Sequence, residues 1–265
     1  MIGSVIGDVV GSRFEFNNIK TKEFELFTKD DSFTDDSVLT MATAEWLLHG
    51  GEVKNYYADW ASNYPYAGYG GNFVAWIQRV RWLGEAGPYN SCGNGSAMRI
   101  SPVGWAFETL EETLAAAKVS AECTHNHPEG IKGAQAVALC IFMARNGASK
   151  DEIRSEVEKV FGYDLGFTID GIRPRYGWES EFGNGVLCQA SVPQAIVAFL
   201  EGNDFEDCIR NAISIGGDSD TIGCITGSIA EAFYGVPQDI REAVESYLPA
   251  EFMRVINEFE NKFQK

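Results

Sequence analysis

Hydrophobic and polar residues recur along most of this chain with the period of an α-helix. The first clear example covers residues 36–49, where one face is apolar and Gly50-Gly51 ends the pattern. Thr34 or Asp35 is placed to cap this helix, because a short polar side chain accepts the unpaired N–H groups of a first turn. The pattern therefore predicts a helix that begins beside acidic residues.

The same periodicity continues over much of the remaining sequence, whereas period-2 alternation is scarce and no βαβ rhythm is present. A mostly α-helical fold follows. No Pro/Ser-rich linker and no shift in charge marks a boundary, so we expect a single domain over residues 1–265. The further predicted helices cover residues 110–123, 128–145, 150–161, 193–200, 205–213 and 220–234, and a charged amphipathic stretch covers 238–263.

Small residues form a stripe along the predicted helix 220–234. Gly223, Gly227 and Ala230 fall on one face at helical spacing. Because a glycine inside a helix costs about 1 kcal/mol relative to alanine, the stripe indicates that another backbone approaches closely. Gly7 and Gly11 would permit the same close packing of a first helix near the N-terminus.

A glycine-rich run from Gly162 to Gly185 is long for a loop inside a compact domain. It carries Arg173, Arg175, Tyr176 and Trp178, so it either covers a site or is a coil of structural importance only. The sequence leaves both interpretations open.

Two short segments repeat one chemical arrangement almost 200 residues apart. Thr34-Asp35-Asp36 and Asp218-Ser219-Asp220-Thr221 each place two aspartates and a hydroxyl where a helical pattern begins. Neighbouring aspartates repel and are costly to bury unpaired, so they favour bound cations. Oxygen-only ligands select Mg²⁺, Mn²⁺ or Ca²⁺ over zinc. If the segments meet, four carboxylates balance two divalent ions, as in a two-metal hydrolase; the alternative is that each segment merely caps a helix.

Two other motifs are excluded at the second segment. A haloacid-dehalogenase-type DxDxT motif needs a preceding buried strand and most of an α/β domain after it, whereas Gly216-Gly217 precede Asp218 and few residues follow. An EF-hand needs further acidic ligands, a central glycine and a terminal glutamate at fixed offsets, and these are missing.

A run of small residues from Ser91 to Ile100 has backbone N–H groups that can form an anion-binding nest. It is not a Walker A loop, because the chain contains no Gly-Lys-Ser/Thr. Asn94-Gly95 is also a common turn sequence, so a purely structural loop is the alternative. Beside an acidic metal site, a phosphate cradle would imply a phosphorylated substrate.

Three further groups have weaker signals. Glu15, at the expected end of the first helix, is by itself a solvated charge. His125-Asn126-His127 has no clear third metal ligand, so we expect a polar contact to a ligand or a helix cap there, with Pro128 at the first helical position. The six cysteines form no CxxC pair and are expected to be reduced, buried thiols. They are Cys92, Cys123, Cys140, Cys188, Cys208 and Cys224.

Composition narrows the classes of partner and location. The 265 residues are 45% hydrophobic, and 21 basic against 38 acidic side chains give a net charge of −17. That balance argues against broad contact with nucleic acid, which needs a basic face. The first twelve residues include Asp8 and no Lys or Arg, unlike a signal peptide, and no run of about 18 uncharged apolar residues could span a membrane. We therefore expect a cytoplasmic protein with no membrane partner.

Taken together, these motifs resemble the ADP-ribosylglycohydrolase family, which includes dinitrogenase-reductase-activating glycohydrolase and the ADP-ribosyl-acceptor hydrolases. The resemblance covers nearly the whole chain in the family's motif order. The residues that carry it are Gly7-Asp8, Gly11, Glu15, Thr34-Asp35-Asp36, Gly93-Asn94-Gly95-Ser96-Ala97-Met98-Arg99, Thr124-His125-Asn126-His127-Pro128 and Gly216-Gly217-Asp218-Ser219-Asp220-Thr221-Ile222-Gly223.

The resemblance implies an all-α orthogonal helical bundle with a dinuclear Mg²⁺ or Mn²⁺ centre in a central cleft. It implies proton transfer by Glu15, with Asp36 as the second candidate, and an adenosine side near His125. The pyrophosphate would lie against Gly93, Asn94, Gly95, Ser96, Ala97 and Met98. The implied metal ligands are Thr34, Asp35, Asp36, Asp218, Asp220 and Thr221.

The implied reaction releases ADP-ribose from an ADP-ribosylated protein or small conjugate by cleavage at the anomeric carbon of the ribose. The acceptor linkage stays open among arginine, serine, poly(ADP-ribose) and small molecules, and we expect a monomer. Two alternatives remain: a two-metal phosphohydrolase acting on a nucleotide, and a non-catalytic ADP-ribose-binding protein.

Overall fold

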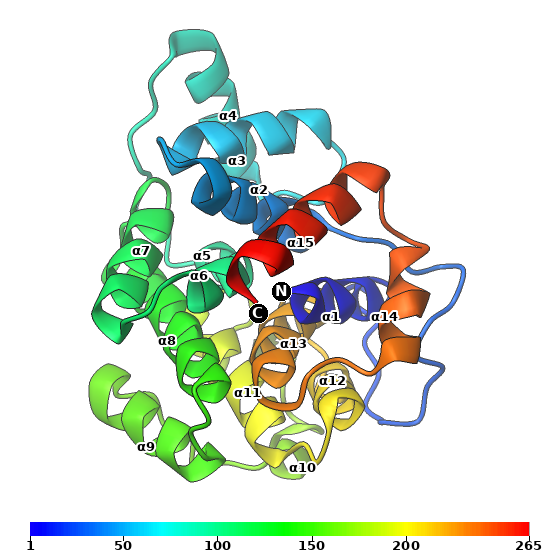
Figure 1. The fold of residues 1–265 in the computed structure, drawn as a ribbon. Helices are drawn as coiled ribbons and strands as arrows, with labels where there is room; N and C mark the ends of the chain where they lie inside the picture. Colours follow the sequence, from blue (N-terminus) through cyan, green and yellow to red (C-terminus); the bar gives the residue numbers. More distant parts are fainter. Residues whose placement is uncertain (265) are drawn as a thin grey trace.

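The computed structural model describes residues 1–264, which form fifteen helices and one small hairpin (Figure 1). The all-α prediction is confirmed. The helices are α1 (Ile2–Ser12), α2 (Asp35–His49), α3 (Val53–Asn63), α4 (Gly71–Leu83), α5 (Gly95–Met98), α6 (Ser101–Ala106), α7 (Leu110–Glu122), α8 (Pro128–Arg145), α9 (Lys150–Phe161), α10 (Ile169–Ile172), α11 (Cys188–Glu201), α12 (Phe205–Ser214), α13 (Ser219–Tyr234), α14 (Gln238–Glu245) and α15 (Ala250–Phe263), and the strands are β1 (Glu179–Ser180) and β2 (Gly183–Asn184).

Local capping explains why several predicted helices begin where they do. Thr34 caps α2 by accepting a hydrogen bond from the backbone N–H of Asp36. Pro128 occupies the first turn of α8, and His127 caps it with its ring. Ser149 and Glu152 form a capping box at α9. These contacts satisfy N–H groups that have no partner inside the helix, so the starts of the three helices are well defined.

Three helix predictions differ from the structure. The first helix ends at Ser12, so Glu15 lies in the turn beyond it. Helix α11 begins ahead of Pro193, because Leu187 pairs with Gly93 in an antiparallel bridge that fixes an earlier start. The amphipathic stretch at the C-terminal end is divided into α14 and α15, with Pro249 at the N-cap position of the second. Helices α3, α4, α5, α6 and α10 were not predicted.

Helices α1 and α13 lie side by side at the centre of the molecule (Figure 1). Their backbones touch along the predicted glycine stripe: a Cβ at Gly7 would lie 1.9 Å from the carbonyl oxygen of Gly223, and one at Gly227 would lie 2.1 Å from that of Gly3. Real Cβ atoms are never this close to a backbone oxygen. The close approach expected from the glycines is therefore confirmed.

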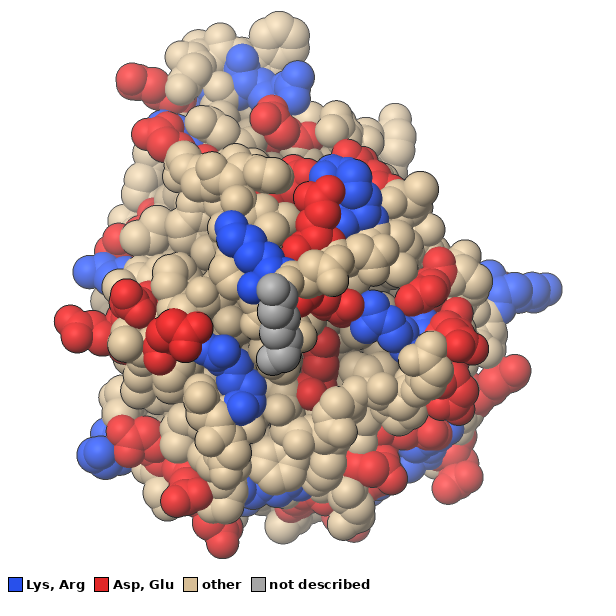
Figure 2. Space-filling model, in the orientation of Figure 1, with Lys and Arg blue, Asp and Glu red and all other residues tan. Residues whose placement is uncertain are grey.

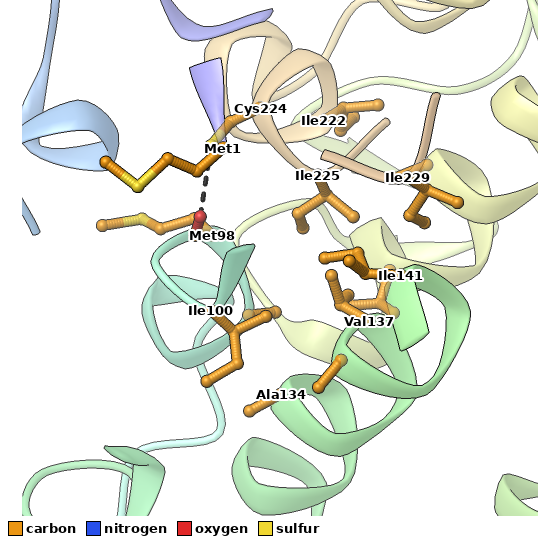
Figure 3. Packing of buried hydrophobic residues seen from close by; sticks show 14 of the residues in the cluster. Met1, Met98, Ile100, Ala134, Val137, Ile141, Ile222, Cys224, Ile225 and Ile229 are labelled. Atoms are coloured by element: carbon orange, nitrogen blue, oxygen red, sulfur yellow. Dashed lines mark hydrogen bonds between the residues drawn. The ribbon is translucent and has the colours of Figure 1, made fainter. Parts of the chain in front are cut away.

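The opposite side of α13 packs into the hydrophobic core. Figure 3 shows Ile225 and Ile229 of α13 beside Val137 and Ile141 of α8, all of them fully buried. In the same view the thiol of Cys224 donates to the backbone oxygen of Met98, at the end of α5 (3.2 Å). This contact fixes the end of α5 relative to the second turn of α13.

The surface visible in Figure 2 carries Lys and Arg side chains interspersed with acidic ones rather than a continuous basic face. Arg210 pairs with Glu206, and Arg241 pairs with Glu260. Among residues 1–264 no helix is both long and apolar enough to cross a bilayer.

Candidate active site

A cleft of about 510 Å³ opens between the starts of α2 and α13 on one side and the loop before α5 on the other. It brings together segments that are far apart in the sequence, including both aspartate segments. The predicted site residues that line it are Glu15, Asp35, Asp36, Gly93, Asn94, Gly95, Met98, His125, Asp218, Asp220 and Thr221.

Asp8 of α1 organises the first aspartate segment. It is fully buried, and its carboxylate accepts hydrogen bonds from the backbone N–H and the hydroxyl of Thr34 (2.9 and 2.7 Å) and from the N–H of Ser37 (3.1 Å). The hydroxyl of Ser37 donates to the same carboxylate. A buried carboxylate with several donors is strongly held, so Asp8 fixes where α2 begins.

Because glycines let α1 and α13 approach so closely, carboxylates from three helices converge. Oxygens of Asp8, Asp36 and Asp220 lie within 4.8 Å of one another, and so do oxygens of Glu15, Asp218 and Asp220. Asp220 belongs to both groups. The two aspartate segments therefore do meet, as the sequence predicted they would if they formed one site.

This cluster has too few positive partners for its charge. Burial, followed by the charges of Asp220 and Asp8, raises the pKa of Asp36 well above its usual range. Burial also raises the pKa of Asp218 to about 6, against hydrogen bonds from Asp220 and Asn94 that lower it. Oxygen Oδ1 of Asp36 is buried without a hydrogen-bond partner in the described residues. An all-oxygen donor set with an orphaned carboxylate oxygen fits hard divalent cations.

Two hydroxyls complete the donor set around Asp36. The hydroxyl of Thr221 donates to Oδ2 of Asp36 at 3.3 Å. The hydroxyl oxygen of Thr34, whose proton is donated to Asp8, lies 3.3 Å from the same Oδ2, although Thr34 itself does not line the cleft. Asp35 lines the cleft but lies outside both carboxylate groups, and its backbone N–H donates to Ala67 (2.7 Å). Burial and the charges of Asp220 and Asp8 nevertheless raise the pKa of Asp35 well above its usual range.

Glu15 is half-buried and lines the cleft. Burial, then the charges of Asp220 and Asp8, raises its pKa to about 8. Its backbone oxygen accepts from the amide of Asn18 (3.0 Å) and from the indole N–H of Trp178 (3.0 Å). The amide of Asn18 also donates to the backbone oxygen of Gly217 (2.9 Å), which ties the Glu15 turn to the second aspartate segment.

Only part of the predicted phosphate loop faces the cleft. The amide of Asn94 donates to Asp218 (2.7 Å) rather than pointing into open space. Ser96 is fully buried and its hydroxyl donates to the backbone oxygen of Gly130 (2.7 Å), and Ala97 is also buried away from the cleft. Gly93 and Gly95 line the cleft, so the wall there is backbone.

His125 packs against this loop and also lines the cleft. A Cβ at Gly95 would be 3.1 Å from Nε2 of His125, so that nitrogen is against the loop. On the other side of the ring, Nδ1 is 2.7 Å from the hydroxyl of Thr124. Burial and the charge of Arg99 lower the pKa of His125 well below its usual value, so the ring is neutral. No histidine belongs to the carboxylate clusters found among residues 1–264.

Sequence reasoning assigned no role to Asp8 and left Trp178 undecided. The signal for Asp8 was its charge in the middle of the apolar run Ile2–Ser12, where an unpartnered carboxylate would be costly. In the 162–185 run, Trp178 lines the cleft, whereas Arg175 pairs with Glu181 and the hydroxyl of Tyr176 donates to Ala190. The run also contains α10 and β1, so it is not a featureless coil.

Known proteins share this fold and sequence pattern. A solved structure titled "ADP-ribosylglycohydrolase-related protein complex" superposes with a TM-score of 0.72 and 25% identity, covering 99% of this chain and 96% of its own. ADP-ribosylhydrolase ARH3 of Homo sapiens is 26% identical over 93% of this chain and 88% of its own length. ADP-ribosylarginine hydrolase Tri1 of Pseudomonas putida is 24% identical over 89% and 70%, respectively. The family model described as ADP-ribosylglycohydrolase matches residues 1–265, and the chain therefore belongs to the ADP-ribosylglycohydrolase family.

Proposed function

We propose that this protein is a metal-dependent hydrolase that releases ADP-ribose from an ADP-ribosylated acceptor by cleaving the bond at the anomeric carbon of the ribose. The observation that carries the proposal is the arrangement of one cleft, in which a cluster of buried carboxylates faces a glycine-lined backbone wall. The first surface suits cations that bind ribose hydroxyls, and the second suits a pyrophosphate. Similarity to ADP-ribosylhydrolase ARH3 and to ADP-ribosylarginine hydrolase Tri1 supports the same substrate class.

The cofactors in this proposal are two divalent cations, Mg²⁺ or Mn²⁺. When bound, such ions stabilise charge that develops on the sugar oxygens in the transition state. The proposed ligands are Thr34, Asp35, Asp36, Asp218, Asp220 and Thr221, and the geometry adds Asp8, whose oxygens lie in one of the two carboxylate groups.

Glu15 is the proposed proton-transfer residue. In the metal-free protein burial, the largest cause, raises its pKa to about 8, so the carboxyl can hold a proton near neutral pH. Glu15 also lines the cleft beside Asp218 and Asp220. Asp36 was the second candidate, but its Oδ2 accepts from the hydroxyl of Thr221 and the residue is deeply buried. These contacts favour Asp36 as a ligand and leave proton transfer to Glu15. Bonds from Asn18 and Trp178 to its backbone hold Glu15 in place.

The decisive experiment is an assay for released ADP-ribose. Purified protein is incubated with Mg²⁺ or Mn²⁺ and peptides that carry ADP-ribose on arginine or on serine, and the products are identified by mass spectrometry. We expect free ADP-ribose and an intact acceptor, with no release in chelator. Asp218→Ala should abolish turnover, whereas Asp239→Ala, an exposed aspartate on α14, should not.

The same assay distinguishes the proposal from its two alternatives by the products it detects. AMP or orthophosphate would indicate a two-metal phosphohydrolase that acts on the pyrophosphate. Tight binding of ADP-ribose with no product from any linkage would indicate a binding protein. Full activity without metal in both Asp35→Ala and Asp218→Ala would contradict the two-metal part of the proposal.

A further inference from the structure

The guanidinium of Arg99 is a positive charge buried in the protein interior beside the cleft. Its side chain is fully buried and packs on Tyr57, with 4.0 Å between Cζ and the ring centroid. Nη2 donates to the backbone oxygen of Ser120 (2.8 Å) and to the hydroxyl of Thr124 (2.9 Å), whereas Nε and Nη1 have no partner among residues 1–264. A buried cation with so few acceptors is costly, so its presence calls for a compensating role.

Thr124 connects Arg99 to His125, which lines the cleft. The hydroxyl of Thr124 lies 2.7 Å from Nδ1 of His125, and all three side chains are buried. The hydroxyl oxygen accepts from the guanidinium, and a hydroxyl polarised in this way becomes a stronger donor. Its single proton is therefore directed to Nδ1 of His125, which must then be the unprotonated nitrogen of the neutral ring.

The opposite arrangement would have Nδ1–H of His125 donate to Thr124, with the threonine proton turned toward the neighbouring Cys123. That arrangement points the positive end of an N–H dipole at the guanidinium of Arg99, whereas a lone pair on Nδ1 is attracted by it. The thiol of Cys123 donates to the backbone oxygen of Ser120 (3.4 Å), so it does not need Thr124 as a partner. Electrostatics therefore favours the proton on Nε2.

We propose that Arg99 is a positioning residue that acts through Thr124 to hold His125 as the Nε2–H tautomer, so that the ring presents a donor to an anionic phosphate oxygen of the substrate. Nε2 is the nitrogen that lies against the glycine wall, because a Cβ would be 3.1 Å from it at Gly95 and 3.6 Å at Gly93. The positive charge of Arg99, buried beside the same cleft, would favour an anion there. The identity of the anion rests on the proposed function, but the tautomer does not.

The tautomer can be measured directly by nitrogen-15 NMR of the imidazole rings in ligand-free, metal-free protein. The chain has three histidines, so single His→Gln variants of His49 and His127 assign the signals. Thr124→Val removes the hydroxyl with little change of shape, Thr124→Ser restores it, and Arg99→Met removes the charge. Thr113→Val is the matched control, because Thr113 is equally buried and its hydroxyl bonds only to Thr109 of the same helix region.

We expect His125 to be Nε2-protonated in the wild type, the Thr124→Ser variant and the Thr113→Val control. In Thr124→Val and Arg99→Met, a population with the proton on Nδ1 should appear. The affinity for ADP-ribose, measured by calorimetry, should fall about tenfold in Thr124→Val and recover in Thr124→Ser. A merely structural threonine would change affinity without changing the tautomer.

Two results would overturn the proposal: a wild-type ring protonated on Nδ1, or an Nε2–H ring that is unchanged in both Thr124→Val and Arg99→Met. If Arg99→Met does not fold, the threonine variants still decide. The proposed function is tested separately by release of ADP-ribose from wild-type protein. If the wild-type protein released no ADP-ribose but showed the expected tautomer, the proposed function would be rejected and the positioning role of Arg99 would still be supported.

Discussion

Replacing Gly7 by alanine tests whether the contact of α1 with α13 builds the site. The new Cβ would lie 1.9 Å from the backbone oxygen of Gly223, whereas ordinary contact begins at 3.4 Å, so the helices must separate by about 1.5 Å (3.4 − 1.9). The obstacle is backbone, which cannot rotate away as a side chain can. Overpacking a well-packed core costs about 1–3 kcal/mol, and this case belongs at the upper end.

An opposing effect is the better helix propensity of alanine, which is worth about 1 kcal/mol relative to glycine. The clash outweighs it, so Gly7→Ala should lower the free energy of unfolding by about 2 kcal/mol. The displacement would also move Asp8, the next residue, relative to Asp220 of α13. We therefore expect weaker binding of Mg²⁺ or Mn²⁺ in the same variant.

Urea denaturation gives the free energy of unfolding, and an unchanged m-value would show that the same surface is exposed. Gly87→Ala is the control, because Gly87 is exposed and a Cβ there would meet no atom within 4 Å. Its effect should be within about 0.5 kcal/mol. If Gly7→Ala were as stable as wild type, the helices would not be in backbone contact and our explanation of the site would be wrong.

The remaining predictions concern the carboxylates. In metal-free protein, burial raises the pKa of Asp218 from 3.8 to about 6, so the folded state holds this proton more tightly than the unfolded state. The free energy of unfolding should therefore fall as the pH rises from about 4 to about 6, by up to about 3 kcal/mol, because each unit of pKa shift is worth about 1.36 kcal/mol. Asp218→Asn should remove this loss, raising the melting temperature in chelator at pH 8 while abolishing turnover; an unchanged melting curve would contradict the assignment. Mg²⁺ or Mn²⁺ at 100 times its dissociation constant should stabilise the wild type by about 2.7 kcal/mol, and Asp239→Ala equally, but not Asp218→Asn. Glu15→Gln should lower the rate of ADP-ribose release about 10²–10⁴-fold in a product assay, while calorimetry shows ADP-ribose binding retained.

Much of the fold could be predicted because its signals are local. Helices α2, α8 and α9 have clear caps and a regular apolar period, so their bounds agree with the sequence-based prediction within one residue. Helix α4 was missed although its buried residues Phe73, Trp76, Ile77 and Val80 have helical spacing, because the glycine-rich stretch before it was the dominant signal. Helix α11 begins where a long-range bridge to Gly93 places it, and no local pattern contains that information.

The site could be predicted where its functional groups lie together in short sequence segments. Repeated aspartates and hydroxyls indicated that Thr34–Asp36 and Asp218–Thr221 belong together, and the structure does bring them together. The direction of each side chain was not predictable. Asn94 belongs to a loop of suitable composition, yet its amide is used by Asp218, and Ser96 is anchored to Gly130. Composition indicates which groups are available, whereas packing decides which of them face the cleft.

Asp8 illustrates why the rest depends on tertiary structure. Its partners, Thr34 and Ser37, are more than 25 residues away, and its neighbour Asp220 is reached only because α1 and α13 touch. A Cβ at Gly11 would lie 2.5 Å from Cα of Asp220 itself, so the glycines of α1 set the position of a carboxylate as well as the helix spacing. The tightest backbone contact in the core and the most repulsive group of charges are therefore one structural unit. A cation that binds the carboxylates also relieves the repulsion that this contact creates, which couples metal binding to stability.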